Sequence, residues 1–168
     1  RINIISYLDD GQSNALNKLL KEIKTEFFIW LDADDVISPD FIYQALAEIR
    51  KAKEKDRRPI ISITANSIII DERGKFLKYQ IGLRDQDFLI KNGVWFGKFP
   101  CRIWNTQLSR NVGNFDENLY YCMDYDFLRR QYFDNRTVQT IHLNKTLGAF
   151  RHHVNSKTGN DINTPFVK

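Results

Sequence analysis

The stretch Phe27-Phe-Ile-Trp-Leu-Asp-Ala-Asp-Asp35 decides the fold. Its first five residues are apolar without a break, which is too short for a surface helix and predicts a strand that is buried on both faces. Three carboxylates follow within four residues. We therefore expect residues 27–31 to form a central strand of a largely parallel sheet, with an acidic turn at its carboxyl end.

Apolar residues at helical spacing lie on both sides of this strand. A helix is expected from Ser13, its cap, to Ile23, and a second one begins with the cap Ser38 and Pro39 in its first turn. With a short strand over residues 2–8, the order is strand, helix, strand, helix. That order is typical of a parallel α/β unit.

The second half of the chain is less regular. A long β-branched run predicts a strand, and a turn after it predicts a hairpin. Neither a repeat nor a linker interrupts the pattern, so we expect one domain over residues 1–168. The expected elements of this half are strands at 60–70, 75–79 and 138–143 and helices at 85–91 and 125–133.

The composition excludes several classes of protein. The net charge of +4 is mild, and the basic run at 51–58 alternates with acids at a helix end, which favours a solvated surface over a nucleic-acid or lipid patch. No apolar stretch approaches the ~20 residues of a membrane-spanning helix. Cys101 and Cys122 are the only cysteines, which suits a reducing, cytoplasmic location. We expect no nucleic-acid partner.

The acidic turn is the strongest candidate for a site. Three adjacent carboxylates repel one another unless a cation or solvent lies among them, and oxygen ligands suit Mg²⁺ or Mn²⁺. In open parallel sheets, ligands bind beyond the carboxyl ends of strands. The alternative is a polar turn in which Asp35 or Ser38 caps the next helix.

Three other segments carry polar residues that chemistry could use. Gly11 precedes a helix whose N–H groups could bind a phosphate, although an ordinary turn explains one glycine better. Asp124 and Asp126 stand two residues apart at a helix start and do not share a face, so one of them could be a catalytic base and simple capping is equally compatible. The cluster at 151–157 could bind a ligand or form a surface loop.

Four segments of the chain matter more in combination than singly. They are Gly11-Gln-Ser-Asn-Ala-Leu-Asn-Lys18, Trp30-Leu-Asp-Ala-Asp-Asp35, Val112-Gly-Asn-Phe-Asp-Glu-Asn-Leu119 with Met123-Asp-Tyr-Asp-Phe127, and Phe150-Arg-His-His-Val-Asn-Ser-Lys-Thr158. Taken together and in this order, they resemble the family 2 glycosyltransferases of the GT-A fold. This resemblance covers most of the chain and implies an α/β, Rossmann-like domain with a mixed, mainly parallel sheet flanked by helices.

The resemblance implies an enzyme of polysaccharide biosynthesis that moves a sugar from a nucleoside-diphosphate sugar, by default a UDP-sugar, to a hydroxyl of a glycan or lipid-linked acceptor. The transfer would be inverting and would need Mn²⁺ or Mg²⁺. A lipid-linked acceptor would place the protein peripherally at the inner face of the membrane.

The resemblance also implies a role for each matching residue. Asp34 would bind the metal, with Asp32 and His153 as further ligands, and Asp124 would be the base that deprotonates the acceptor. The donor would be bound by Asp32, Asp35, Gly11, Asn17, Arg151 and Lys157.

The sequence departs from the family pattern in two places. The family's first strand, which ends in P-x-Y/F-N, and its second strand, which ends in a nucleobase-reading aspartate, have no counterpart before Gly11. The chain is therefore expected to begin inside the domain. Met123 stands where an acid usually precedes the base.

Two rival interpretations stay open at the level of sequence. Residues 27–36 also resemble the first motif of haloacid-dehalogenase-type phosphatases, in which Asp32 would be a nucleophile and Asp34 a general acid. A non-catalytic, glycosyltransferase-like binding module is the other. Hydrolysis of an aryl phosphate would favour the first, and failure of the folded protein to bind any nucleotide would favour the second.

Overall fold

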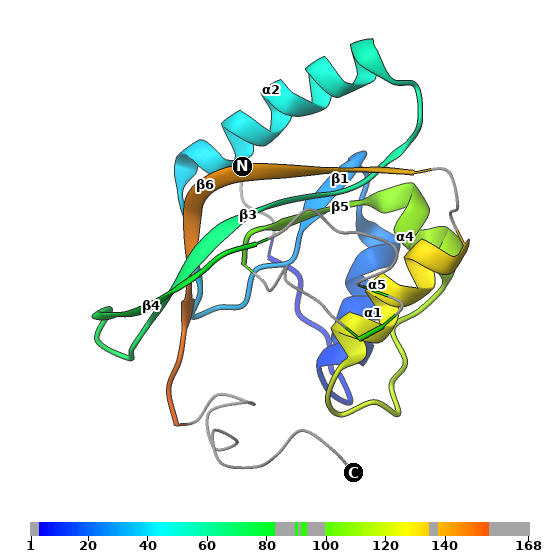
Figure 1. The fold of residues 1–168 in the computed structure, drawn as a ribbon. Helices are drawn as coiled ribbons and strands as arrows, with labels where there is room; N and C mark the ends of the chain where they lie inside the picture. The colour runs from blue at the N-terminus through cyan, green and yellow to red at the C-terminus, as the bar shows by residue number, and fades with distance from the viewer. Residues whose placement is uncertain (1–3, 83–89, 91, 94–99, 135–137, 155–168) are drawn as a thin grey trace.

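The computed structural model describes residues 4–82, 90, 92–93, 100–134 and 138–154. They form an α/β fold in which helices flank one curled sheet (Figure 1). The expected helix at 85–91 lies outside these residues except for Ile90. Lys157 also lies outside them. The elements are α1 (Gln12–Glu22), β1 (Phe27–Ile29), β2 (Val36–Ile37), α2 (Pro39–Lys55), β3 (Ile60–Ile70), β4 (Phe76–Gln80), β5 (Arg102–Asn105), α4 (Thr106–Val112), α5 (Met123–Asp134) and β6 (Gln139–Arg151).

The six-stranded sheet is mixed, as predicted. Its strand order is β1-β5-β3-β6-β2, and β4 pairs with β3 off this path. The longest pairing, β3 with β6, is parallel and places Ile63 opposite Ile141. The other described pairings are antiparallel, so the sheet has fewer parallel pairs than expected, because β4 and β5 both run against β3.

The position of β1 corrects two expectations. β1 ends the strand order instead of lying at the centre, and its three residues are only partly buried. β5 lies between β1 and the centre of the sheet, because it pairs with both β1 and β3. The strand expected at residues 2–8 is also absent from the part that is described, where Ile4 and Leu8 are 91% and 96% exposed. These two side chains have no core to enter.

The helix starts follow local capping chemistry. α2 begins as predicted, with the backbone N–H of Asp40 donating to the Ser38 hydroxyl at 3.3 Å and Pro39 in the first turn. α1 differs from the prediction, because Gly11, at φ 116°, is its cap. Ser13 lies inside the helix and is buried, with its hydroxyl 2.7 Å from the sulfur of Met123.

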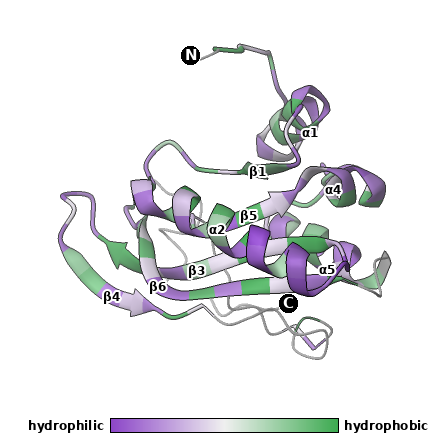
Figure 2. Ribbon diagram, turned by 90° about the horizontal axis from the view of Figure 1, so that it is seen from above, coloured by the Kyte–Doolittle hydropathy of each residue, from purple (hydrophilic) through white to green (hydrophobic). Residues whose placement is uncertain are grey.

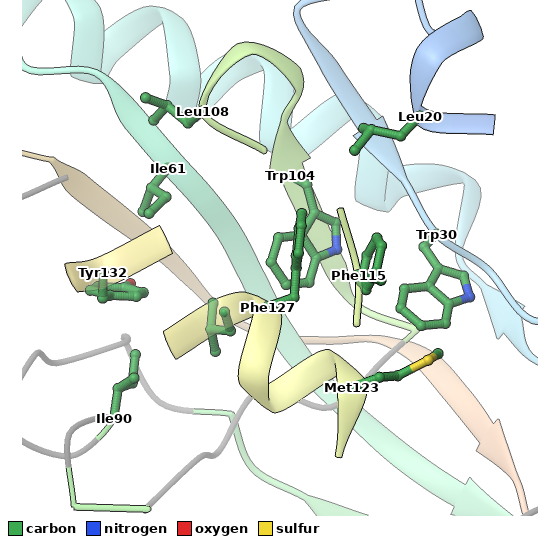
Figure 3. Packing of buried hydrophobic residues seen from close by; sticks show 11 residues of the cluster. Leu20, Trp30, Ile61, Ile90, Trp104, Leu108, Phe115, Met123, Phe127 and Tyr132 are labelled. Carbon is green, nitrogen blue, oxygen red and sulfur yellow. The ribbon is translucent and has the colours of Figure 1, made fainter. Parts of the chain in front are cut away.

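Two apolar clusters form the core. One joins α2 to the sheet, and hydrophilic and hydrophobic residues alternate along this helix as expected when one face is buried (Figure 2). The other cluster lies among α1, α4, α5 and the sheet and is rich in aromatic rings (Figure 3). Within the described residues, no helix is both long enough and apolar enough to cross a bilayer.

Candidate active site

The acidic turn joins β1 to β2 beside the end of β6. The backbone N–H of Asp35 donates to the carbonyl of Asp32 at 3.2 Å, which closes the turn. β2 then pairs with β6, and Val36 lies opposite Ala149. This pairing brings the end of β6 and the residues just after it, more than a hundred positions away in sequence, against Asp34 and Asp35.

Asp34 contacts a second residue that the sequence put forward as a metal ligand. Its Oδ2 lies 2.8 Å from Nε2 of His153, and the two side chains are 38% and 25% exposed. The pair is therefore accessible from solvent, and it offers one oxygen and one nitrogen donor at the same place.

Asp35 is the buried member of the turn. Its Oδ1 accepts the backbone N–H of Arg151 at 2.9 Å, and its Oδ2 has no hydrogen-bond partner among the described residues. The pKa of Asp35 is raised from 3.8 to about 6, chiefly by burial. The backbone bond from Arg151 opposes this rise, and the negative charges of Asp32 and Asp34 add to it. A buried carboxylate with one unpaired oxygen is an environment that a nearby cation would stabilise.

These residues fit a divalent cation that keeps several ligands of its own. Within the described part of the chain, no group of three or more acidic, histidine or cysteine side chains is placed to hold a metal ion. Asp34 and His153 form a two-residue donor set, with Asp32 in the same turn. Mg²⁺ and Mn²⁺ in nucleotide sites commonly use one or two protein ligands and complete their shell with water and phosphate oxygens. Asp34 and His153 could supply the one or two protein ligands of such a cation.

Arg151 holds the acidic turn from outside. Its guanidinium donates to the backbone carbonyl of Asp34 at 2.9 Å and to the carbonyls of Asp71 and Glu72 at 3.1 and 3.2 Å. One side chain thus ties the turn to the end of the β3–β4 hairpin. Donor binding by Arg151 stays a prediction, and these bonds add a structural role that the sequence did not indicate.

Asn17 links two of the segments that carried the resemblance. It is 4% exposed. Its carbonyl accepts the N–H of Phe115 at 2.7 Å, and its amide group donates to the Phe115 carbonyl at 3.0 Å and to Glu117 at 2.8 Å. Both ends of the amide are therefore engaged in holding α1 against the loop before α5. Contact between Asn17 and a donor stays a prediction.

We expect Asn17→Ala to lower the free energy of unfolding by about 2–3 kcal/mol, because it leaves buried backbone groups of Phe115 without partners. Asn14→Ala is the matched control, since Asn14 bonds the same Glu117 side chain through an exposed hydrogen bond, and it should cost below about 0.5 kcal/mol. Urea unfolding measures both. Equal stabilities of the two variants would contradict the assignment.

The first residues of α1 contact both the acidic turn and the residue before Asp124. Gly11 is exposed, and its N–H donates to Asp9 at 3.1 Å, so phosphate binding there stays a prediction. The next residue, Gln12, reaches Oδ1 of Asp32 at 3.5 Å, and Ser13 after it contacts Met123. Met123 immediately precedes Asp124. The acidic turn and the expected base are therefore connected through two adjacent residues of one helix start.

Asp124 and Asp126 have different surroundings, as their spacing predicts. Asp124 is partly buried in the first turn of α5, and its Oδ1 accepts the N–H of Tyr125 at 2.8 Å. Asp126 pairs with Arg130, whose Nε donates to it at 2.8 Å, and Arg130 also donates to the carbonyls of Val112 and Asn114. Asp126 thus has a structural partner that fixes the loop before the helix.

Removal of the charge of Asp35 should change the pH dependence of stability. Its pKa is about 6 in the folded protein against an ordinary 3.8, so between pH 4 and 6 the folded state binds more protons than the unfolded state. Stability should then fall as pH rises through this interval, by up to roughly 3 kcal/mol. In metal-free urea unfolding, Asp35→Asn should lack this decline and exceed the parent in stability at pH 8. A parallel pH profile for both proteins would contradict it.

Comparison with known proteins points to one family. The model of glycosyl transferase family 2 matches residues 4–134. An uncharacterized glycosyltransferase of Rickettsia typhi is 28% identical over 143 residues, which cover 76% of this chain and 43% of the relative. An uncharacterized glycosyltransferase of Rickettsia felis is 27% identical over 146 residues, covering 82% and 22%. This chain thus spans less than half the length of these curated relatives.

Solved structures support the fold. The crystal structure of Staphylococcus aureus TarS 1-349 in complex with UDP-GlcNAc superposes with a TM-score of 0.65 at 16% identity, covering 94% of this chain and 43% of that one. A second crystal structure of Staphylococcus aureus TarS 1-349 gives a TM-score of 0.58 at 17% identity, covering 84% of this chain and 40% of that one. The likeness in three dimensions therefore extends well past the acidic turn, to nearly the whole chain.

Proposed function

This chain belongs to glycosyl transferase family 2, and on that premise we propose that it transfers a sugar from a nucleoside-diphosphate sugar to an acceptor hydroxyl, with inversion and with the help of Mn²⁺ or Mg²⁺. The observation that supports the proposal most is the contact of Asp34 with His153 in a solvent-accessible acidic turn. A hard oxygen ligand and an imidazole that meet at one accessible point support a cation site whose coordination the donor diphosphate would complete.

The residues of the turn would divide the work of donor binding. Asp34 and His153 would hold the cation, and Asp32 would contact the cation or the ribose. Bound Mn²⁺ or Mg²⁺ would neutralise the charge that develops on the diphosphate leaving group. Asp35 would hold the turn in place, because it is buried and its bond to the Arg151 backbone fixes the end of β6.

Asp124 would take the proton in the transfer step. The acceptor oxygen attacks the anomeric carbon, the bond from that carbon to the diphosphate oxygen breaks, and the acceptor proton passes to the carboxylate. The nucleoside diphosphate leaves with the bonding electron pair. Asp124 follows Met123, which contacts Ser13, and the neighbouring Gln12 contacts Asp32 of the acidic turn; this connection supports a place for Asp124 near the donor.

A UDP-sugar is the donor that we propose. The support is the fold-level likeness to TarS, whose crystal structure holds UDP-GlcNAc. For the acceptor we propose a glycan or a lipid-linked glycan, in polysaccharide biosynthesis at the cytoplasmic side of a membrane. The half-exposed Phe76 and the more exposed Tyr79 and Ile81 in and beside β4 supply an apolar surface that suits such peripheral contact.

A thermal-shift screen of nucleotides with and without Mn²⁺ tests the proposal. At a UDP concentration one hundred times Kd, binding stabilises the folded state by about 2.7 kcal/mol, which should raise Tm by roughly 5–10 °C. CDP and GDP serve as controls for the base. No shift with any nucleotide, together with hydrolysis of an aryl phosphate, would favour the phosphatase interpretation instead.

A further inference from the structure

We propose that Trp30 is a positioning residue whose indole N–H fixes the carboxylate of Asp32 for the donor and its cation. The indole donates from Nε1 to Oδ1 of Asp32 at 2.8 Å, from only two residues before it in the chain. The identity of the ligand rests on the proposed function, whereas the bond itself does not. In the sequence, Trp30 belongs to the apolar run and opens the matching segment Trp30–Asp35, but neither pattern assigned it a role of its own.

The indole is anchored in the aromatic core. Trp30 is 8% exposed, and its ring meets that of Phe115 edge to face with centroids 5.6 Å apart. Phe115 in turn stacks on Phe127 of α5 at 3.9 Å, and Asn17 of α1 holds the backbone of Phe115 at both its N–H and its carbonyl. Figure 3 shows Trp30 beside Phe115, and Met123 belongs to the same buried cluster.

This anchoring makes the donor of the hydrogen bond immobile. An indole ring buried in this cluster cannot turn without disturbing the core, so its N–H direction is set by the packing of α1 and α5. Gln12 contributes a second, longer contact of 3.5 Å to the same oxygen from the exposed start of α1. Oδ1 of Asp32 is therefore turned toward the protein, and Oδ2 is the oxygen left to a ligand.

A fixed carboxylate binds a cation or ribose with less loss of freedom than a mobile one. Loss of the indole N–H should therefore weaken binding at Asp32 while the fold persists. The effect should be about tenfold, which is what loss of one hydrogen bond to a charged group commonly produces. It should appear in the affinity for Mn²⁺ and UDP, and so in KM more than in kcat.

Trp30→Phe is the variant that isolates the bond, because it keeps an aromatic ring against Phe115 and removes only the N–H side of the indole. Trp104→Phe is the matched control, since Trp104 is buried in the same cluster, where its ring packs on Phe127 and Arg102. Calorimetric titration with UDP in the presence of Mn²⁺ should show about tenfold weaker binding for the first variant and less than a twofold change for the second. Equal losses, or no loss in Trp30→Phe, would overturn the proposal.

A double-mutant cycle with Asp32→Asn shows whether Trp30 acts through Asp32. If it does, Trp30→Phe should change the UDP affinity much less in the Asp32→Asn protein than in the parent. An undiminished effect in that background would overturn the proposal, because the tryptophan would then act by another route.

A measurement without any nucleotide separates this proposal from the proposed function. The chain has three tryptophans, so the indole N–H resonance of Trp30 can be assigned from its loss in Trp30→Phe. We expect it to move on Asp32→Asn by more than either of the other indole resonances. If the parent binds no nucleotide and the resonance still moves, the proposed function fails and the positioning bond stands. An unmoved resonance overturns the bond.

Discussion

Asp124→Asn should lower the rate of sugar transfer by about 10²–10⁴-fold, the usual contribution of a general base. Asparagine has nearly the same size and can still accept the hydrogen bond that the Tyr125 N–H donates to this side chain, so the start of α5 should persist. UDP affinity should stay within a few-fold of the parent, because the base acts on the acceptor. Steady-state transfer assays and calorimetric titration measure the two quantities on the same preparations.

Asp126→Asn is the control within the same helical turn. It weakens the ion pair with Arg130, whose two exposed fractions near 30% make it worth about 1 kcal/mol or less. Most of the transfer rate should therefore persist, with a small loss of stability. The reverse pattern, an inactive Asp126→Asn and a nearly normal Asp124→Asn, would show that Asp126 is the base and that the assignment of this helix start is wrong.

Asp34→Ala should abolish Mn²⁺-dependent nucleotide binding, at least a hundredfold in Kd, while the protein still unfolds cooperatively. The side chain is partly exposed and its contact is with His153, outside both apolar clusters, so its removal costs little packing. Calorimetric titration with UDP, with and without Mn²⁺, gives the result.

His153→Ala tests how much the imidazole contributes to metal binding. It should weaken Mn²⁺-dependent binding less than Asp34→Ala does, since imidazole is the weaker partner for a hard cation. An Asp34→Ala protein that binds UDP with unchanged dependence on Mn²⁺ would count against the metal site altogether.

The sequence predicted the helices and strands whose boundaries depend on neighbouring residues. The β-branched run gave β3 its bounds of Ile60–Ile70, and the Ser38-Pro39 pair gave α2 its start. The place of β1 in the sheet was missed because it depends on β5. That strand begins with Arg102 and ends with Asn105, both buried, so it does not read as an apolar core strand.

The candidate site was predicted as a set of residues and not as an arrangement. Asp34 and His153 lie 119 positions apart, and a single sequence contains no signal for that contact; the resemblance alone joined them. The structural roles of Asn17 and Arg151 were missed for the same reason. The bond of Trp30 to Asp32 was missed because an apolar run indicates burial and a motif match indicates a segment, but neither gives the direction of an indole N–H.

The location of a bound cation tests the account most directly. In crystals grown with Mn²⁺ and UDP, diffraction data collected at the manganese edge identify the ion by its anomalous signal. The account predicts one strong peak within about 2.0–2.3 Å of a carboxylate oxygen of Asp34, bridged to the diphosphate, with His153 turned toward it. A peak elsewhere, or a bound UDP without manganese at the acidic turn, would contradict it.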